Sequence, residues 1–345
     1  MTVKDIKRIV HAWVLKELSP LEGFQGAFYH GSINWLNDDE LFPSTSDIDI
    51  IAVVADPGQH ISGKRIHRDL ILEVSYMPAE AFQTAEQILG TFYLAGSFRK
   101  PGIIADKKGQ LTMLQHQVAE KYAAPYWIHR RCQDAEDRSI EFLGQLNEQS
   151  PLHDQVTSWL FARGLMAHML LLAGLKNPTV RKRYVAAQKL LSAHHSLDFH
   201  ERLLQSIKFA HLTPSDVERH LTTLTEAFDM ASAVIKTPYR FATDISRIAR
   251  PITIDGSYEL IRTGFHREAM FWIIATHCRC QHVLCQDAPR SIQQQHNEQF
   301  SRLLQELGIA TFKDREQSNS EALIFLSEVR SMAEKIMTPF SAPTA

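Results

Sequence analysis

Three acidic residues on two predicted strands have the types and spacing needed to hold a divalent cation. Asp47 and Asp49 are one residue apart at the start of the apolar run 47–54, and Glu73 lies in the middle of a second apolar run, 70–76. Side chains alternate between the two faces of a strand, so Asp47 and Asp49 share one face. If the two strands are neighbours, three carboxylates meet at one place.

The chemistry expected of these carboxylates is the binding of Mg²⁺ together with a substrate phosphate. A buried glutamate is costly unless it is paired, protonated or metal-bound, and three like charges repel one another without a cation. Mg²⁺ takes oxygen ligands and commonly bridges substrate phosphates. The alternative is that Asp47-x-Asp49 only begins a strand and that Glu73 lies on a solvent-facing edge; the short motif taken alone favours this alternative.

A turn of small residues strengthens the metal–phosphate interpretation. Gly31-Ser32 closes a predicted strand, 26–30, and lies one strand before Asp47. Such a turn lets the backbone approach phosphate oxygens closely, with N–H groups and the hydroxyl as donors. Most Gly-Ser pairs are only turns, and the weight of this one comes from its position in the chain.

These residues together resemble a known family. The series His30-Gly31-Ser32, a loop, Ser46-Asp47-Ile48-Asp49-Ile50 and an acidic residue on a later strand is similar to the polymerase-beta-type nucleotidyltransferase superfamily. Within it, residues 72–76 and the helical second half most resemble bacterial aminoglycoside adenylyltransferase-like proteins. The motifs fall within residues 1–125, and beyond them the likeness is one of layout.

The resemblance implies a Mg²⁺-dependent transfer of AMP from ATP to a hydroxyl of a small molecule. Two Mg²⁺ ions would be held by Asp47 and Asp49, and Glu73 would be a third metal ligand or the general base, with both roles open. An aminoglycoside-like antibiotic is the best single candidate for the acceptor, and ATP against other nucleotides stays open. The residues implied to contact the triphosphate are Gly31, Ser32 and Ser46.

Two other functions stay open beside the transfer to a small molecule. One is nucleotidyl transfer to a protein or RNA, and the other is a catalytically degenerate module that binds nucleotide without turnover. Lys plus Arg number 37 and Asp plus Glu number 39, a net charge of −2. Nucleic-acid partners usually call for a basic face, so this balance counts against RNA.

The pattern of apolar residues predicts an α+β protein. Strands and helices mix in residues 1–126, which we expect to be a nucleotidyltransferase-type mixed sheet with flanking helices. Residues 127–345 are expected to be an α-helical bundle, with helices over 156–172 and 258–284 and one candidate strand at 252–254. The resemblance implies that this bundle binds the acceptor. The first residues, 1–18, predict an amphipathic helix and lack the features of a signal peptide, so we expect a cytoplasmic protein.

Two basic stretches are candidates for phosphate contact. Residues 177–184 are expected to begin a helix, and the resemblance implies that Arg181 or Lys182 reaches the triphosphate; a solvated basic turn is an equal alternative. Residues 58–65 nearly spell a phosphate-binding P-loop, but Arg65 replaces the Ser or Thr that would hold magnesium. We interpret this stretch as a hairpin turn. Contact of Lys64, Arg65 and Arg68 with phosphate stays open, and a location in solvent is the favoured alternative.

Three of the four cysteines gather in one apolar stretch. Cys278, Cys280 and Cys285 surround His282, and Cys278, His282 and Cys285 would share one helix face. Structural zinc normally takes four ligands, so we favour packing over a metal for this group. The layout is also poor for a disulfide framework, which agrees with a reducing environment.

Overall fold

The protein forms two compact units, which divide after Asp134. The computed structural model describes residues 1–177 and 179–341. A five-stranded mixed sheet with helices makes up the first unit, and the described part of the second is helical, so the predicted α+β class is confirmed. The expected boundary, after residue 126, falls near the beginning of α5, and the units divide farther along that helix.

The first unit begins with a helix that the apolar spacing of residues 1–18 predicted. Thr2 caps it through a hydrogen bond from the backbone N–H of Asp5, and its buried face then repeats at helical spacing. The elements in chain order are α1 (Val3–Glu17), β1 (Phe24–His30), η1 (Gly31–Asn34), β2 (Ile48–Val54), η2 (Pro57–Gln59), β3 (Gly63–His67), β4 (Leu70–Pro78), η3 (Ala79–Phe82), α2 (Ala85–Gly90), α3 (Ala95–Phe98), β5 (Ile103–Asp106), α4 (Gln110–Lys121) and α5 (Pro125–Gly144).

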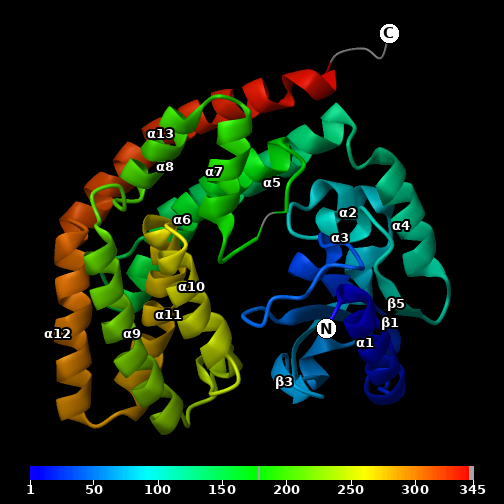
Figure 1. Cartoon of the computed structure of the whole chain (residues 1–345), viewed down its shortest axis with the longest axis horizontal. Helices are drawn as coiled ribbons and strands as arrows, with labels where there is room; N and C mark the ends of the chain where they lie inside the picture. The colour runs from blue at the N-terminus through cyan, green and yellow to red at the C-terminus, as the bar shows by residue number, and fades with distance from the viewer. Residues whose placement is uncertain (178, 342–345) are drawn as a thin grey trace. The chain divides into compact units, whose positions relative to one another are not determined.

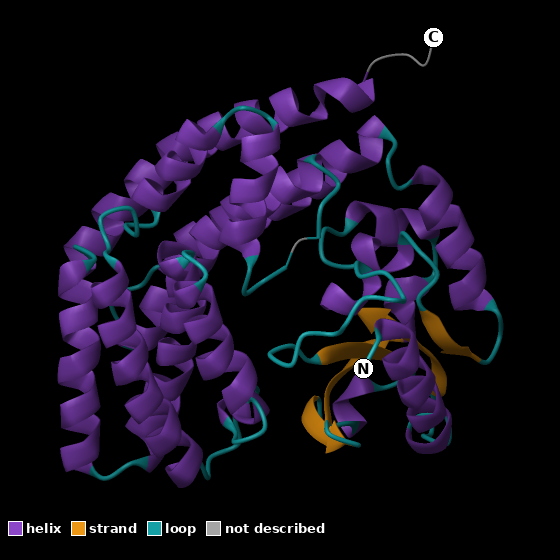
Figure 2. Cartoon of the chain, viewed as in Figure 1, coloured by secondary structure: helices purple, strands orange, loops and turns teal. Residues whose placement is uncertain are grey.

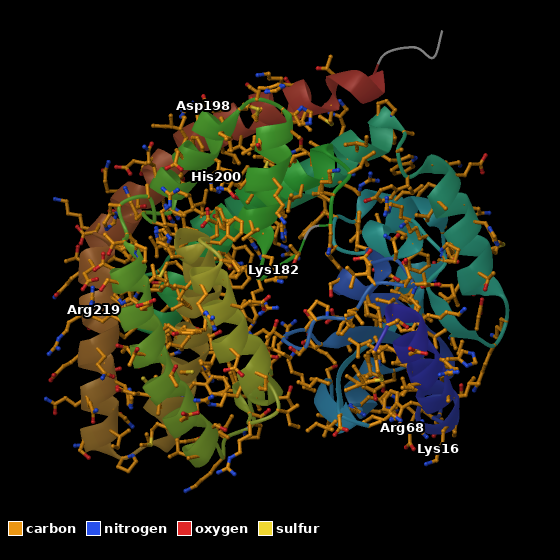
Figure 3. All side chains as sticks on the ribbon, in the orientation of Figure 1. Lys16, Arg68, Lys182, Asp198, His200 and Arg219 are labelled. Carbon is orange, nitrogen blue, oxygen red and sulfur yellow. The ribbon has the colours of Figure 1, made fainter. Side chains whose placement is uncertain are left out.

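The strands are ordered β3-β4-β2-β1-β5. β2 and β4 are parallel neighbours, and the other pairs are antiparallel. β3 and β4 form a hairpin whose two turn residues, Arg68 and Asp69, have φ of 47° and 62°. Positive φ at both central residues is typical of a tight two-residue hairpin turn. Arg68 is labelled at this hairpin in Figure 3.

Helices cover both faces of the sheet. One face packs on α1, with Ile48, Ile50 and Val74 in the shared core. The opposite face packs on α2, α3 and α4 through residues such as Phe28 and Ile51, and Figure 1 shows α1 apart from these three helices. Because side chains alternate along a strand, the face of Ile51 is also the face of Asp49.

One expectation for the first unit was wrong. After β4, the chain forms η3 and α2 as two separate elements, because Thr84 caps a new helix with Gln87 as its reciprocal partner. The stretch 58–65, expected to be a turn, instead includes the beginning of β3. The sequence did not predict β3, because its residues are mostly polar and few are of the types common in strands. They are Gly63-Lys64-Arg65-Ile66-His67.

The second unit is built from long helices (Figure 2). Their bounds, in chain order, are α6 (Leu152–Ala173), α7 (Arg183–Ala193), α8 (Leu197–Ser206), α9 (Pro214–Val234), η4 (Ala242–Ile245), η5 (Pro251–Asp255), α10 (Gly256–Arg262), α11 (His266–Asp287), α12 (Arg290–Glu306) and α13 (Phe312–Ser341).

The central helix of the second unit is α6. It is long and apolar enough to cross a membrane, but 83% of its most apolar window is buried by the rest of the unit. Two polar side chains of α6 are paired inside this core: Trp159 Nε1 donates to Ser318 Oγ at 3.1 Å, and Arg163 Nη1 donates to the carbonyl of Trp159 at 2.8 Å. Such pairing offsets the cost of removing polar atoms from water.

Three sequence-based expectations for the second unit need correction. The candidate strand 252–254 lies in η5, which is a π-helical turn. The helix expected over 258–284 is two helices, α10 and α11, separated at Gly264, whose φ is 88°. The helix expected to begin near Asn177 begins at Arg183. The proline at position 178, in the stretch expected to begin this helix, lies outside the described residues.

Candidate active site

One row of side chains runs across four neighbouring strands of the first unit. His30 on β1 pairs with Asp49 on β2, Asp49 pairs with Glu73 on β4, and Glu73 pairs with Lys64 on β3. Residues directly opposite each other on neighbouring strands project from the same face. The row therefore places two carboxylates, one ammonium and one imidazole on the face that α2, α3 and α4 cover in part.

The cover ends before this row. Two residues farther along the strands, on the same face, the pair Phe28 and Ile51 is buried under the helices. Asp49 and Glu73 stay half-exposed. Asp47 precedes β2 and turns its side chain to the same place. Carboxylate oxygens of Asp47, Asp49 and Glu73 all lie within 4.8 Å of one another. The expected meeting of three carboxylates is present, and its chemical role stays a prediction.

Lys64 belongs to this site, although the sequence favoured a location in solvent for it. Its Nζ lies 2.7 Å from Asp47 Oδ2 and also contacts Glu73 Oε2, and its side chain is 7% exposed. The expectation that Lys64 lies in solvent was wrong, because the register of β3 on β4 directs it onto Glu73. The signal that could have found Lys64 is its spacing from Ile66 in the near-P-loop stretch. Residues two apart share one face if the segment is a strand.

The ammonium of Lys64 sets the ionisation of Asp47. Burial alone would raise the pKa of Asp47, but the charge of Lys64, its hydrogen bond and a hydrogen bond with Glu73 outweigh burial and hold the pKa below its usual value. Asp47 is therefore ionised at neutral pH. An ionised carboxylate is the form that ligates a hard cation.

Gly31 brings the backbone against Asp49. Its φ of 64° is in the left-handed region, and a Cβ added there would lie 2.0 Å from Asp49 Oδ2. Glycine is the residue that tolerates both the conformation and the close approach. Asn34, buried at the end of η1, donates its side-chain amide to the carbonyl of Tyr29 and ties this turn to β1.

The two serines expected to contact phosphate flank the acidic cluster along the chain. Ser32 lies in η1 directly after Gly31, and Ser46 lies directly before Asp47. Neither hydroxyl has a hydrogen-bond partner among the described side chains and backbone groups, so both are open to a ligand. His30 is neutral, since burial lowers its pKa to about 4, and its Nδ1 lies 2.7 Å from Ser97 Oγ.

The basic residues expected to reach the phosphates, Arg181 and Lys182, belong to the second unit (Figure 3 labels Lys182). Arg181 Nη1 donates to the carbonyl of Ile252 at 2.9 Å. Burial and the charge of Arg181 lower the pKa of Lys182. The next residue, Arg183, is buried against the ring of Phe271. The alternative of a fully solvated basic turn therefore fails for Arg183, and a phosphate contact stays a prediction for Arg181 and Lys182.

The cysteines of α11 do not form a ligand set with His282 in the described structure. Cys278 and Cys280 are buried, and burial raises the pKa of the Cys278 thiol to about 12. Cys285 is exposed, and its Sγ lies 4.0 Å from Asn297 Oδ1. Their separation agrees with packing as their main role.

Comparisons with known proteins add no relative to this picture. No family model matches the sequence, and no curated protein is similar enough to count as a relative. The functional argument therefore starts from the site itself.

Proposed function

We propose that this protein is a nucleotidyltransferase that moves AMP from ATP to a hydroxyl group of a small molecule. The observation that carries the proposal is the meeting of Asp47, Asp49 and Glu73 within 4.8 Å, on a half-exposed sheet face. The tight Gly31 turn lies directly against Asp49. Carboxylates beside a backbone turn of small residues suit a metal-bound triphosphate.

The donor set fits magnesium. All three acidic side chains offer oxygen ligands, which Mg²⁺ prefers. Three carboxylates and the Lys64 ammonium leave a net charge of −2, which matches one divalent ion, and a second ion would arrive with the triphosphate. When bound, Mg²⁺ would neutralise charge on the transferring phosphoryl group. The residues proposed to hold it are Asp47 and Asp49, and Glu73 is either a third ligand or the general base.

The remaining residues would position the substrates. Backbone N–H groups at the start of η1 and the hydroxyls of Ser32 and Ser46 would donate hydrogen bonds to the triphosphate. The acceptor oxygen forms a bond to the α-phosphorus, and the bond from that phosphorus to pyrophosphate breaks. The hydroxyl proton passes to a general base, which is Glu73 if that residue does not ligate the metal. Positioning and charge stabilisation are the main contributions expected in this class of reaction.

A specific contact favours a second candidate function. The Lys64 ammonium already lies between Asp47 and Glu73, where a cation would bind. A chain that relied on this internal cation would bind nucleotide without turnover. Under the first candidate, Lys64 holds the two carboxylates in place until a stronger cation arrives.

The test is to incubate the whole protein with MgATP or MgGTP and a panel of aminoglycosides, other antibiotics and metabolites. Mass spectrometry would detect an acceptor heavier by one nucleotide, and a coupled assay would detect pyrophosphate. We expect Asp49→Ala to abolish transfer and keep the fold, since Asp49 is half-exposed. The matched control is Asp39→Ala, an exposed aspartate of the same unit.

The outcomes separate the candidates. Wild-type turnover in Asp49→Ala would refute the proposal. Calorimetric binding of MgATP without pyrophosphate release, with every acceptor including proteins and RNA, would favour the module without turnover. Transfer to a protein or RNA alone would keep the chemistry and change the acceptor class.

Glu73→Gln separates the two roles left open for that residue. If Glu73 is the general base, the variant should lose the chemical step while MgATP binding stays close to that of the wild type, because the amide is isosteric and cannot accept the proton. If Glu73 is a metal ligand, both should fall together. Single-turnover kinetics beside calorimetry would measure the two effects.

A further inference from the structure

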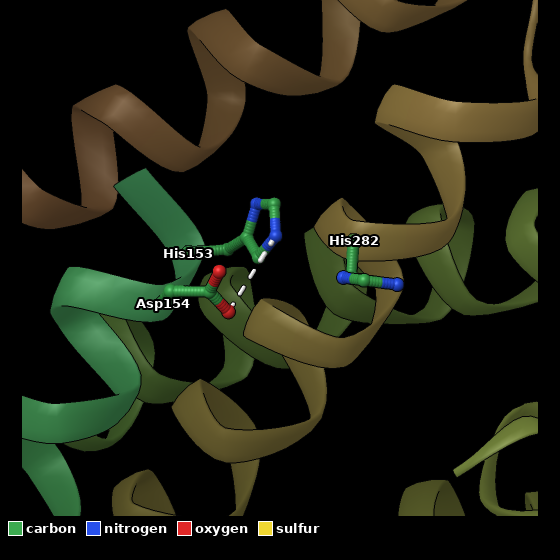
Figure 4. A group of neighbouring side chains, drawn as sticks. All are labelled: His153, Asp154 and His282. Carbon is green, nitrogen blue, oxygen red and sulfur yellow. Dashed lines mark ion pairs between the residues drawn. The ribbon is translucent and has the colours of Figure 1, made fainter. Parts of the chain in front are cut away.

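A second group of potential metal ligands lies in the second unit. His153 and Asp154 are neighbours in the first turn of α6, and His282 lies on α11. Ligand atoms of all three side chains lie within 4.8 Å of one another. Figure 4 shows the three side chains on the two helices, with the His153–Asp154 contact dashed.

Hydrogen bonds within the protein do not account for this arrangement. Asp154 is an acidic residue in the first turn of α6, but no side-chain hydrogen bond caps that helix. His153 Nε2 lies 3.7 Å from Asp154 Oδ1, which is too long for a hydrogen bond. Among the residues that the structure describes, no protein group forms a hydrogen bond with a ring nitrogen of His153 or His282.

The aromatic contacts of the two imidazoles fix the planes of the rings. The His153 and His282 rings meet edge to face with centroids 5.2 Å apart, and Tyr239 stacks on His282 at 4.1 Å. Rings held in a fixed orientation keep their nitrogen atoms in place for a metal ion.

We propose that His153, Asp154 and His282 form a binding site for a transition-metal ion of the Zn²⁺ class. Two imidazole nitrogens and one carboxylate oxygen are ligands that such ions accept, whereas Mg²⁺ prefers oxygen alone. Three protein ligands leave one position for water or an external ligand. The ion would join the first turn of α6 to α11.

This site is independent of the acidic cluster on the sheet. It uses different ligands, selects a different class of ion and lies in the other compact unit. His282 was grouped in the sequence with Cys278 and Cys285, but in the folded unit it meets His153 and Asp154 instead. The metal-ligand character of this helix is thus assigned to its histidine and not to its exposed thiol.

Zn²⁺ titration of the whole protein tests the proposal. Calorimetry would be run with excess Mg²⁺ present, and repeated on Asp49→Ala to remove the acidic cluster as a source of binding. We expect one Zn²⁺ per chain, bound in both proteins, and a higher melting temperature with Zn²⁺. Asp154→Asn and His282→Ala should each weaken Zn²⁺ binding by at least about tenfold. Mutation of residues that only hydrogen-bond to metal ligands already lowers metal affinity by that much.

The controls are Cys285→Ser and His116→Ala, which remove an exposed thiol on the same helix and an exposed histidine of the first unit. Both should bind Zn²⁺ as the wild type does. The proposal is overturned if no Zn²⁺ binds, or if either Asp154→Asn or His282→Ala retains full affinity. Loss of binding in either control, or in Asp49→Ala, overturns it equally. Circular dichroism of each variant confirms that the helices remain.

Discussion

Gly31→Ala should disable the acidic cluster without dismantling the sheet. The new Cβ would lie 2.0 Å from Asp49 Oδ2, whereas real Cβ contacts are essentially never shorter than 3.0 Å. The carboxylate must therefore move by about 1 Å or the turn must open, and a 1 Å misplacement of a reacting group can cost roughly a hundredfold in rate. The left-handed φ of 64° adds about 1–2 kcal/mol of strain for a residue with a Cβ.

Gly109→Ala separates the strain from the collision. Gly109 lies in the same unit with φ of 73°, but no atom lies within 4 Å of its added Cβ. Both variants should lose about 1–2 kcal/mol in urea unfolding, and pyrophosphate release should fall roughly a hundredfold in Gly31→Ala alone. If Gly31→Ala kept the turnover and the Mg²⁺ affinity of Gly109→Ala, the close approach to Asp49 would have no catalytic importance.

Two further substitutions test the charges of the site and the packing of the second unit. Lys64→Met should lower the free energy of unfolding without Mg²⁺ by on the order of 2 kcal/mol, because two carboxylates lose their cation. Since the pKa of Asp47 is depressed, this difference should be full above the ordinary value of 3.8 and shrink as pH falls below it, as urea unfolding across pH would show. Gly164→Ala should cost about 1–3 kcal/mol, because its Cβ would meet Phe271 at 2.6 Å, whereas Gly144→Ala, with open space around it, should be neutral or stabilising in thermal unfolding.

The strands that carry the carboxylates could be predicted from sequence because their signals are local. β2 and β4 are apolar runs interrupted by single acidic residues, so alternation alone placed Asp49 on one face and Ile50 on the other. Their adjacency depends on pairing between segments far apart in the chain. The expectation that they meet came from the cost of an isolated buried glutamate, and the parallel register of Asp49 on Glu73 bears it out.

The parts that sequence could not predict depend on long-range packing. β3 is polar and short, and it becomes a strand only because β4 offers a partner edge. The same pairing places Lys64 opposite Glu73 in the site. Likewise, His153 and His282 are far apart in sequence and meet because α6 packs on α11. The helix break at Gly264 was missed because the apolar spacing continues on both sides of it.

The position of β3 at the end of the strand order has a consequence for association between molecules. An edge strand presents unpaired backbone groups on which another chain can add a strand. β3 is five residues long, carries a positive charge at Arg65 and is followed by a second at the turn residue Arg68. Short length and repelling charge are common protections against edge-to-edge aggregation. Acidic substitutions at Arg65 and Arg68 would replace positive charge with negative charge, which also repels a second copy of this edge. Neutral apolar substitutions would remove the repulsion and favour self-association at high protein concentration.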